Sequence, residues 1–172
     1  WPLLTEVGGW RTDMMFGLNP RASMAWREDG MYGGFYTQAE AREIVEYAAQ
    51  RHIMVVPEIE MPGHSSSALA AYPQFACGCA SCYNGPYSLN VTSYVGGVFC
   101  IARPETLEFL KDVLTEVMDV FPGPYIHIGG DEVRFNNWQN HSLDQQRTNE
   151  LGISSMQVYQ GHFTQQIADW VK

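Results

Sequence analysis

The sequence is poor in positive charge and has no long hydrophobic run. Its 172 residues include 10 Lys and Arg against 19 Asp and Glu, which gives a formal net charge of −9. There is no basic cluster that could neutralise a phosphate backbone, so the composition argues against a nucleic-acid partner. No apolar stretch reaches the roughly 20 residues that a membrane-spanning helix needs. With 45% hydrophobic and 17% charged residues, the composition is ordinary for one globular domain with a sizeable core.

The sequence also lacks an initiator Met and a signal peptide. It begins with Trp1-Pro2, an improbable natural N-terminus, so we expect the 172 residues to be a processed or excised piece. Cysteine is scarce as well. All four cysteines, three of them close together, fall within residues 61–103, a stretch with few regular signals that is too long for an ordinary connection. We expect this stretch to be functional or an insertion.

Three stretches have the apolar periodicity of amphipathic helices. The first covers 38–51 and follows a capping-box pattern in which Thr37 is the N-cap and Glu40 the third helical residue. The second covers 104–121. Proline is favoured as a first helical residue, which sets its start, and the Pro-Gly-Pro sequence that follows ends it. The third helix is predicted to start near Ser154, again with a capping pattern.

Two short apolar runs, 53–59 and 125–128, follow the first two helices directly. They are continuous rather than alternating, which predicts strands buried on both faces of a parallel sheet. The repeated order of helix and buried strand indicates an α/β fold. Both strands end in polar segments that contain glycine, 58–64 and 129–132, and sites in such folds gather at the C-terminal ends of strands. We therefore expect one shared cleft, and we expect 1–35 to form a long loop.

The second polar segment carries two adjacent carboxylates, Asp131 and Glu132, after two glycines. Neighbouring acids repel each other and lose hydration when buried, so a chain that only needs to fold gains little from them. Enzymes use such pairs to divide two tasks, since one acid can stay protonated to donate a proton while the other stays charged. A solvated Asp-Glu dipeptide in a turn is the alternative, and the dipeptide alone does not decide between them.

The residues around both polar segments resemble a known family. Residues 56–64, with the sequence VPEIEMPGH, and residues 127–132, with the sequence HIGGDE, are similar to the β-N-acetylhexosaminidases of glycoside hydrolase family 20. The resemblance implies a (β/α)8 TIM barrel, which usually needs about 250 residues. Residues 1–172 would then be a partial catalytic domain that supplies about strands 3–4 with their helices and a long βα loop. A further segment or a second copy would complete the cleft, so a homo-oligomer is one expectation. Similar stretches are also found at 2–8, 85–100 and 105–122.

The resemblance implies an exo-hydrolase that releases terminal β-linked N-acetylglucosamine or N-acetylgalactosamine from glycans or glycoconjugates. Catalysis would be substrate-assisted, proceed with retention and use no cofactor. Glu132 would be the general acid and then the base. Asp131 would bind the N–H of the 2-acetamido group, whose oxygen attacks C1 and forms a cyclic oxazolinium. A non-catalytic or truncated sugar-binding relative is the alternative.

Four further residues are candidates for the site. His64 matches the family's histidine that hydrogen-bonds near the acid. His127 lies inside an apolar strand, where a satisfied core histidine is common, and we expect it to support residues that touch substrate. Glu60 stands where the family often has Asp, so its hydrogen bonding is open. Trp138 can equally pack in the core or contact sugar.

The cysteines allow three interpretations. Cys82 and Cys100 match positions that often both carry Cys in bacterial relatives, which implies a disulfide and an oxidising compartment: periplasmic, secreted or lysosome-like. Alternatively, Cys77, Cys79, Cys82 and Cys100 could hold a structural zinc ion as an all-thiolate site, although the C-x-C-x-x-C spacing is not the usual one. The third interpretation is free thiols. A zinc-bound interaction module is therefore a rival to the enzyme.

Overall fold

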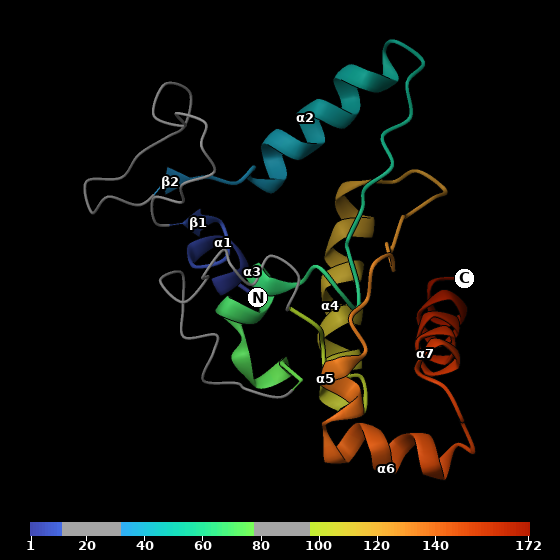
Figure 1. Ribbon diagram of the computed structural model, residues 1–172. Coiled ribbons are helices and arrows are strands. Elements are labelled where there is room, and N and C mark those ends of the chain that lie inside the picture. The colour runs from blue at the N-terminus through green and yellow to red at the C-terminus, as the bar shows by residue number, and fades with distance from the viewer. Residues whose placement is uncertain (12–31, 78–96) are drawn as a thin grey trace.

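The computed structural model describes residues 1–11, 32–77 and 97–172, and most of its elements are helices (Figure 1). Strands β1 and β2 form a small antiparallel pair in which Trp10 lies opposite Gly33. Within the described ranges, no helix is both long and apolar enough to cross a bilayer. The elements are α1 (Leu3–Glu6), β1 (Trp10–Arg11), β2 (Tyr32–Gly33), α2 (Gln38–Ala49), α3 (Ser66–Ala71), the 3-10 helix η2 (Pro73–Phe75), α4 (Pro104–Val120), α5 (Asn136–Gln139), α6 (Ser142–Glu150) and α7 (Met156–Val171).

The three predicted helices are present as α2, α4 and α7. At α2 the predicted capping box is confirmed, because the Thr37 hydroxyl accepts from Glu40 N at 3.2 Å and Glu40 Oε2 accepts from Thr37 N at 2.7 Å. These bonds lower the pKa of Glu40, with the Thr37 backbone N–H as the main cause. At α7 the predicted cap is one residue early. Ser155 has the extended backbone of an N-cap, and its hydroxyl accepts from Val158 N.

Several short elements lie where loops were predicted. The stretch 1–35 contains α1, β1 and β2, and the segment before α7 contains α5 and α6. Helix α6 has almost no apolar residues: Asp144 and Thr148 form its buried face, whereas Leu143 is exposed. Hydrophobic periodicity cannot detect a helix whose buried face is polar.

The two predicted strands lie side by side and run parallel (Figure 1). Glu58 and His127 form a parallel bridge. Ile59 N donates to His127 O at 3.0 Å, and His127 N donates to Pro57 O at 2.9 Å. The pairing is too short to form regular strands here, but its direction is that of the predicted parallel α/β arrangement.

The prediction that these segments are buried on both faces is wrong. Ile59 and Ile128 pack against the core, but Ile53 and Met54 are exposed and Tyr125 is 64% exposed. A central strand of a parallel sheet has a neighbour on each side and helices over both faces. Within the described residues each segment has one paired neighbour, so its other side remains open.

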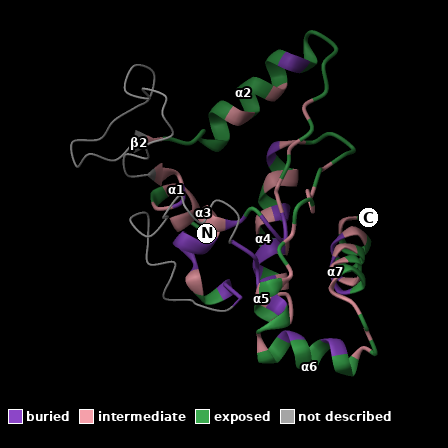
Figure 2. Cartoon of the chain, viewed as in Figure 1, coloured by how far each residue is buried: buried purple, intermediate pink, exposed green. Residues whose placement is uncertain are grey.

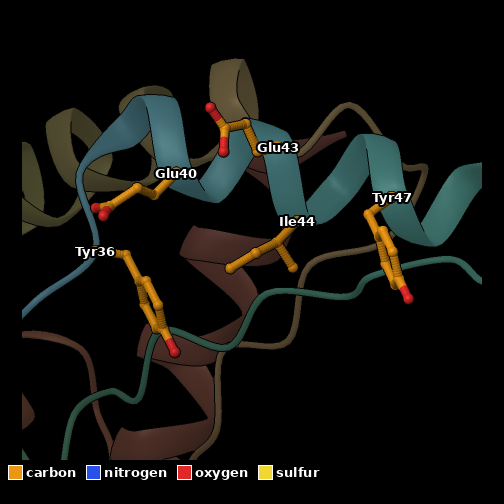
Figure 3. A pocket seen from close by; sticks show the side chains of 5 residues that line it. All are labelled: Tyr36, Glu40, Glu43, Ile44 and Tyr47. Atoms are coloured by element: carbon orange, nitrogen blue, oxygen red, sulfur yellow. The ribbon is translucent and has the colours of Figure 1, made fainter.

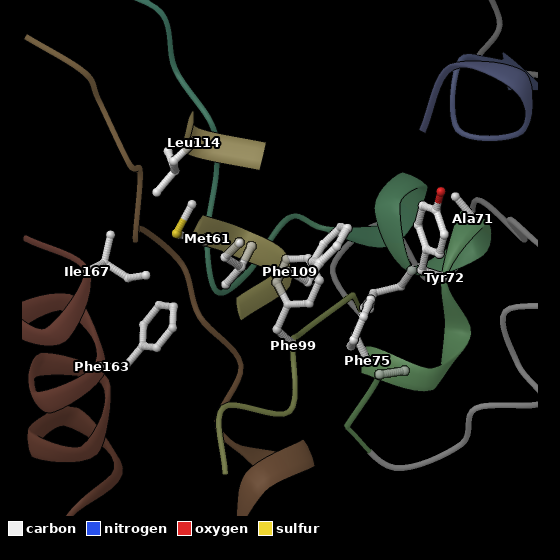
Figure 4. Close-up of a cluster of buried hydrophobic side chains, with 12 residues drawn as sticks. Met61, Ala71, Tyr72, Phe75, Phe99, Phe109, Leu114, Phe163 and Ile167 are labelled. Atoms are coloured by element: carbon white, nitrogen blue, oxygen red, sulfur yellow. The ribbon is translucent and has the colours of Figure 1, made fainter. Parts of the chain in front are cut away.

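The main core lies between the parallel pair, α4 and α7. Met61, at the end of the first segment, lies between Leu114 of α4 and Ile167 of α7 (Figure 4). Phe109 of α4 extends the core towards α3 and η2, where it stacks on Phe75 with ring centroids 4.5 Å apart. Figure 2 shows that α2, in contrast, is mostly exposed. The parallel pair is therefore fixed between two helices, and its C-terminal ends hold the candidate site.

Candidate active site

Asp131, Glu132 and His64 come together at the ends of the parallel pair. His64 Nε2 lies 3.5 Å from Glu132 Oε2 and 4.0 Å from Asp131 Oδ2. Both carboxylate side chains are more than 70% exposed, whereas the His64 side chain is 29% exposed. The two polar segments predicted from the sequence therefore meet, and their side chains present two acids and an imidazole to an open surface.

The backbone leaves the extended conformation around these residues. Gly129 and Gly130 have φ values of 63° and 115°, and the non-glycine residues Glu132 and His64 have φ values of 51° and 49°. Positive φ is uncommon outside glycine, and such strain is concentrated at functional sites. Successive side chains on a regular strand point to opposite faces. The bent backbone instead lets the adjacent acids, Asp131 and Glu132, both lie near one histidine.

Glu60 holds the glycine segment in place. Its Oε1 accepts from Gly130 N at 2.9 Å, which answers the open question about its hydrogen bonding. A Cβ added at Gly129 would lie 2.2 Å from Glu60 Oε2, so the carboxylate occupies the space that a side chain would need. From α7, Gln160 Nε2 donates to Gly130 O at 2.6 Å. Gln160 was not predicted, since nothing in the sequence distinguishes it from an ordinary helix-surface glutamine.

His127 is mostly exposed and is not the core histidine that its apolar neighbours suggest. Its Nδ1 lies 3.0 Å from Glu58 Oε1 and 3.1 Å from Gly129 N. One nitrogen cannot serve both contacts, because it must donate to the carboxylate but accept from the amide. The contact with Gly129 places the His127 imidazole beside the turn that carries the acids.

Trp138 is fully buried, so of its two alternatives the structure supports core packing. Its Nε1 donates to Phe99 O at 2.9 Å. The ring packs edge-on against Tyr159, with centroids 5.4 Å apart. No part of the indole is available to a sugar in this structure.

The described cysteines differ from the expected disulfide. Cys77 and Cys100 are free, buried thiols, so Cys100 does not form the disulfide that the resemblance implied. Cys79 and Cys82 lie outside the described residues. The partners of Cys100 are instead two residues that the sequence did not single out: His141 Nδ1 at 3.7 Å and Asp144 Oδ2 at 3.6 Å.

The buried groups around Asp144 affect one another's ionisation. The pKa of Cys77 is raised by the neighbouring Cys100 thiol, by burial and by the Asp144 carboxylate, to which the Cys77 thiol donates. The pKa of Cys100 is lowered, mainly by its contact with the Cys77 thiol. Burial and the adjacent Asp144 carboxylate raise the pKa of Tyr159.

A separate hollow lies on α2, away from the predicted site residues. Figure 3 shows Tyr36, Ile44 and Tyr47 pointing to the same side of the helix. Glu40 and Glu43 complete its lining. None of the residues predicted for the active site contributes to this hollow.

The sequence model described as "Glycosyl hydrolase family 20, catalytic domain" matches residues 1–172. The chain belongs to glycosyl hydrolase family 20. It is 40% identical over 168 residues to a β-hexosaminidase of Porphyromonas gingivalis, a match that covers 96% of this chain and 19% of that protein. The family resemblance inferred from 56–64 and 127–132 is therefore confirmed.

Solved structures of this family have the same fold over this stretch. A β-N-acetylhexosaminidase from Bacteroides fragilis matches with a TM-score of 0.76 at 35% identity, over 99% of this chain and 29% of that one. A family 20 exo-β-N-acetylglucosaminidase from Vibrio harveyi, in complex with N-acetylglucosamine, matches with a TM-score of 0.71 at 33% identity, over 94% of this chain and 24% of that one. The chain thus spans less than a third of each of these relatives.

Proposed function

We propose that the full-length protein is an exo-β-N-acetylhexosaminidase that hydrolyses terminal β-linked N-acetylglucosamine or N-acetylgalactosamine with retention of configuration. The observation that carries the proposal is the convergence of Asp131, Glu132 and His64 at the ends of two parallel segments, in a chain of family 20. The Vibrio harveyi relative, described as bound to N-acetylglucosamine, supports an amino sugar as substrate.

The proposed reaction uses the substrate's own nucleophile. Glu132 gives its proton to the glycosidic oxygen while the acetamido oxygen attacks C1, so the leaving alcohol departs and an oxazolinium ring forms. Asp131 accepts a hydrogen bond from the acetamido N–H and stabilises the positive charge of the ring. Glu132, now ionised, takes a proton from water as the water attacks C1 and opens the ring. Glu132 is then protonated again, and the sugar is released.

His64 and the glycine turn position the two acids for these roles. His64 Nε2 lies near both carboxylates, so a positive charge on the imidazole would favour the ionised form of either acid. Glu60 and Gln160 hold Gly130 from the N–H side and the C=O side. The acids therefore follow a turn in which both the N–H and the C=O of Gly130 are hydrogen-bonded. A reaction that depends on precise placement requires such a fixed turn.

The two acids are tested separately in the full-length protein with two substrates. Glu132→Gln should lower kcat/KM for chitobiose by 10²-fold or more, because general acid catalysis contributes about that much. The loss should be smaller for an aryl glycoside, whose good leaving group needs less protonation. Asp131→Asn should slow both substrates, since both require the oxazolinium.

Glu43→Gln is the matched control, because Glu43 is an exposed carboxylate on α2. It should retain turnover with both substrates. If Glu132→Gln keeps wild-type kcat/KM on chitobiose, the assignment of the acid is wrong. If the wild type binds N-acetylglucosamine in calorimetry but turns over neither substrate, the protein is a sugar-binding relative instead.

A further inference from the structure

Four potential metal ligands meet in the interior, away from the acid pair. They are the sulfur atoms of Cys77 and Cys100, a ring nitrogen of His141 and a carboxylate oxygen of Asp144, and all four lie within 4.8 Å of one another. They come from three places in the chain: the segment after η2, the segment before α4, and the first turn of α6 with the residue that precedes it. The fold, rather than one local motif, therefore assembles this set.

Two of the four separations have the length expected around a tetrahedral ion, and the other two, both to Asp144, are shorter. Zinc bonds of about 2.3 Å to sulfur and about 2.0 Å to nitrogen or oxygen place neighbouring ligand atoms about 3.3–3.8 Å apart. Asp144 Oδ2 lies 3.0 Å from Cys77 Sγ and 3.6 Å from Cys100 Sγ. His141 Nδ1 lies 3.7 Å from Cys100 Sγ and 2.7 Å from Asp144 Oδ2. Only small movements outward would be needed to admit the ion.

The burial of the cluster favours a cation. Asp144 and Cys100 have no exposed surface, and Cys77 is also buried. A buried carboxylate next to two thiols is costly unless positive charge compensates it. His141 can supply one charge, and Arg103 lies beside Cys100. A divalent ion together with Arg103 would balance the three negative charges of the carboxylate and two thiolates.

The surrounding groups have the character of an outer shell. The hydroxyl of Tyr159 donates to Asp144 Oδ1 at 3.0 Å, which leaves Oδ2 directed at the two sulfur atoms and His141. Residues that ligate metals are commonly oriented by such a second hydrogen bond. Trp138 packs on Tyr159 and belongs to the same buried cluster as the cysteines.

We propose that Cys77, Cys100, His141 and Asp144 bind a structural zinc ion. Four protein ligands close the coordination sphere, so the ion would hold the fold together and leave no position for substrate. Two of the four predicted thiolates are retained in this set, and Cys79 and Cys82, which lie outside the described residues, are not used.

The proposed site connects to the candidate active site through the backbone. Ala76 and Phe99 form an antiparallel bridge, and Cys77 N donates to Val98 O. From the same segment, Phe99 N donates to Pro62 O at 2.9 Å and Gly97 O accepts from Ser65 N at 3.0 Å. Pro62 and Ser65 flank the loop position of His64, so the ion would also brace the loop that carries this histidine.

Zinc content and ligand type test the proposal in the full-length protein. Mass spectrometry of the metal content should find one zinc equivalent that is lost in Cys100→Ser, His141→Ala and Asp144→Asn. Cys79→Ser and Cys82→Ser are the matched controls and should keep it. X-ray absorption at the zinc edge of the wild-type protein should show two sulfur and two nitrogen or oxygen ligands, a measurement that depends on no variant.

Several results would overturn the site. The proposal is wrong if the wild-type protein contains no zinc, or if zinc is retained when His141 and Asp144 are replaced. It is also wrong if zinc is lost from the Cys79 and Cys82 variants, or if the absorption spectrum shows four sulfur ligands. A Cys77–Cys100 disulfide would also exclude the ion. In that case the two cysteines would be alkylated, and gain mass, only after reduction.

Discussion

At the scale of single residues, Gly129 links backbone conformation to the position of the acids. Its φ of 63° disfavours a side chain, and the Glu60 carboxylate occupies the space that a Cβ would need. We expect Gly129→Ala to destabilise the protein by about 1–2 kcal/mol from the left-handed backbone alone. It should also lower kcat/KM, because Glu60 must move away from Gly130 N. Urea unfolding and hydrolysis of an aryl N-acetylglucosaminide would measure the two effects.

Gly161→Ala is the control for this prediction. Gly161 lies in α7, and an added Cβ would meet no atom within 4 Å. Alanine there should stabilise the protein by about 0.5–1 kcal/mol, since glycine is a poor helix residue. Equal effects of the two substitutions would show that the conformation at Gly129 carries no special requirement.

The sequence predicts residues whose role is local and misses those whose role depends on distant contacts. Asp131, Glu132 and His64 stand in recognisable motifs at strand ends. The contacts of Glu60 with Gly130 and of Gln160 with Gly130 span 70 and 30 residues of sequence. Trp138 shows the same limit, because an aromatic residue near the motif fits a sugar cleft and a core equally well until its burial is known.

At the scale of elements, the capping box of α2 makes the stability of that helix depend on pH. The folded-state pKa of Glu40 is lowered, so its stabilising contribution is present above its unfolded value of about 4.3 and is lost as pH falls through the folded value. Glu40→Gln should therefore lower the urea midpoint at pH 7, and the difference from wild type should shrink at low pH.

Two comparisons control this result. Thr37→Ala removes the reciprocal bond and should cost about 1 kcal/mol at pH 7. Glu43→Gln, on the same helix but outside the box, should leave the urea midpoint near that of the wild type at both pH values. A Glu40→Gln deficit that stays constant from pH 7 down to pH 3 would contradict the role assigned to the ionised carboxylate.

Helices with an apolar stripe are predictable from the sequence, whereas those with a polar buried face are not. The periodic leucines, valines and phenylalanines of α4 led to bounds within one residue of those observed. Helix α6 is held by Asp144 and Thr148, which look like surface residues in the sequence. The partners that make Asp144 a buried residue come from other segments, so no local pattern could predict this face.

At the scale of the whole molecule, the parallel pair leaves apolar residues exposed at Ile53, Met54, Val56 and Tyr125. A (β/α)8 barrel would cover such positions with neighbouring strands and helices. We therefore expect residues 1–172, purified alone, to associate through these open edges and to show no turnover as a monomer. Size-exclusion chromatography with light scattering, followed by an assay of each fraction, would test this, and a monomeric fraction with turnover would refute it.

The Glu60 contact has one more consequence, for how a strand can end. Backbone pairing between the two parallel segments reaches Met61 N and Ile128 O, and the next bond between them runs from Gly130 N to the Glu60 side chain. The Glu60 carboxylate thus takes the place of a backbone carbonyl in the hydrogen bonding between the two segments. The chain can turn into conformations that no strand permits while it stays tied to its neighbour, so the sheet edge and the reactive turn form one continuous unit.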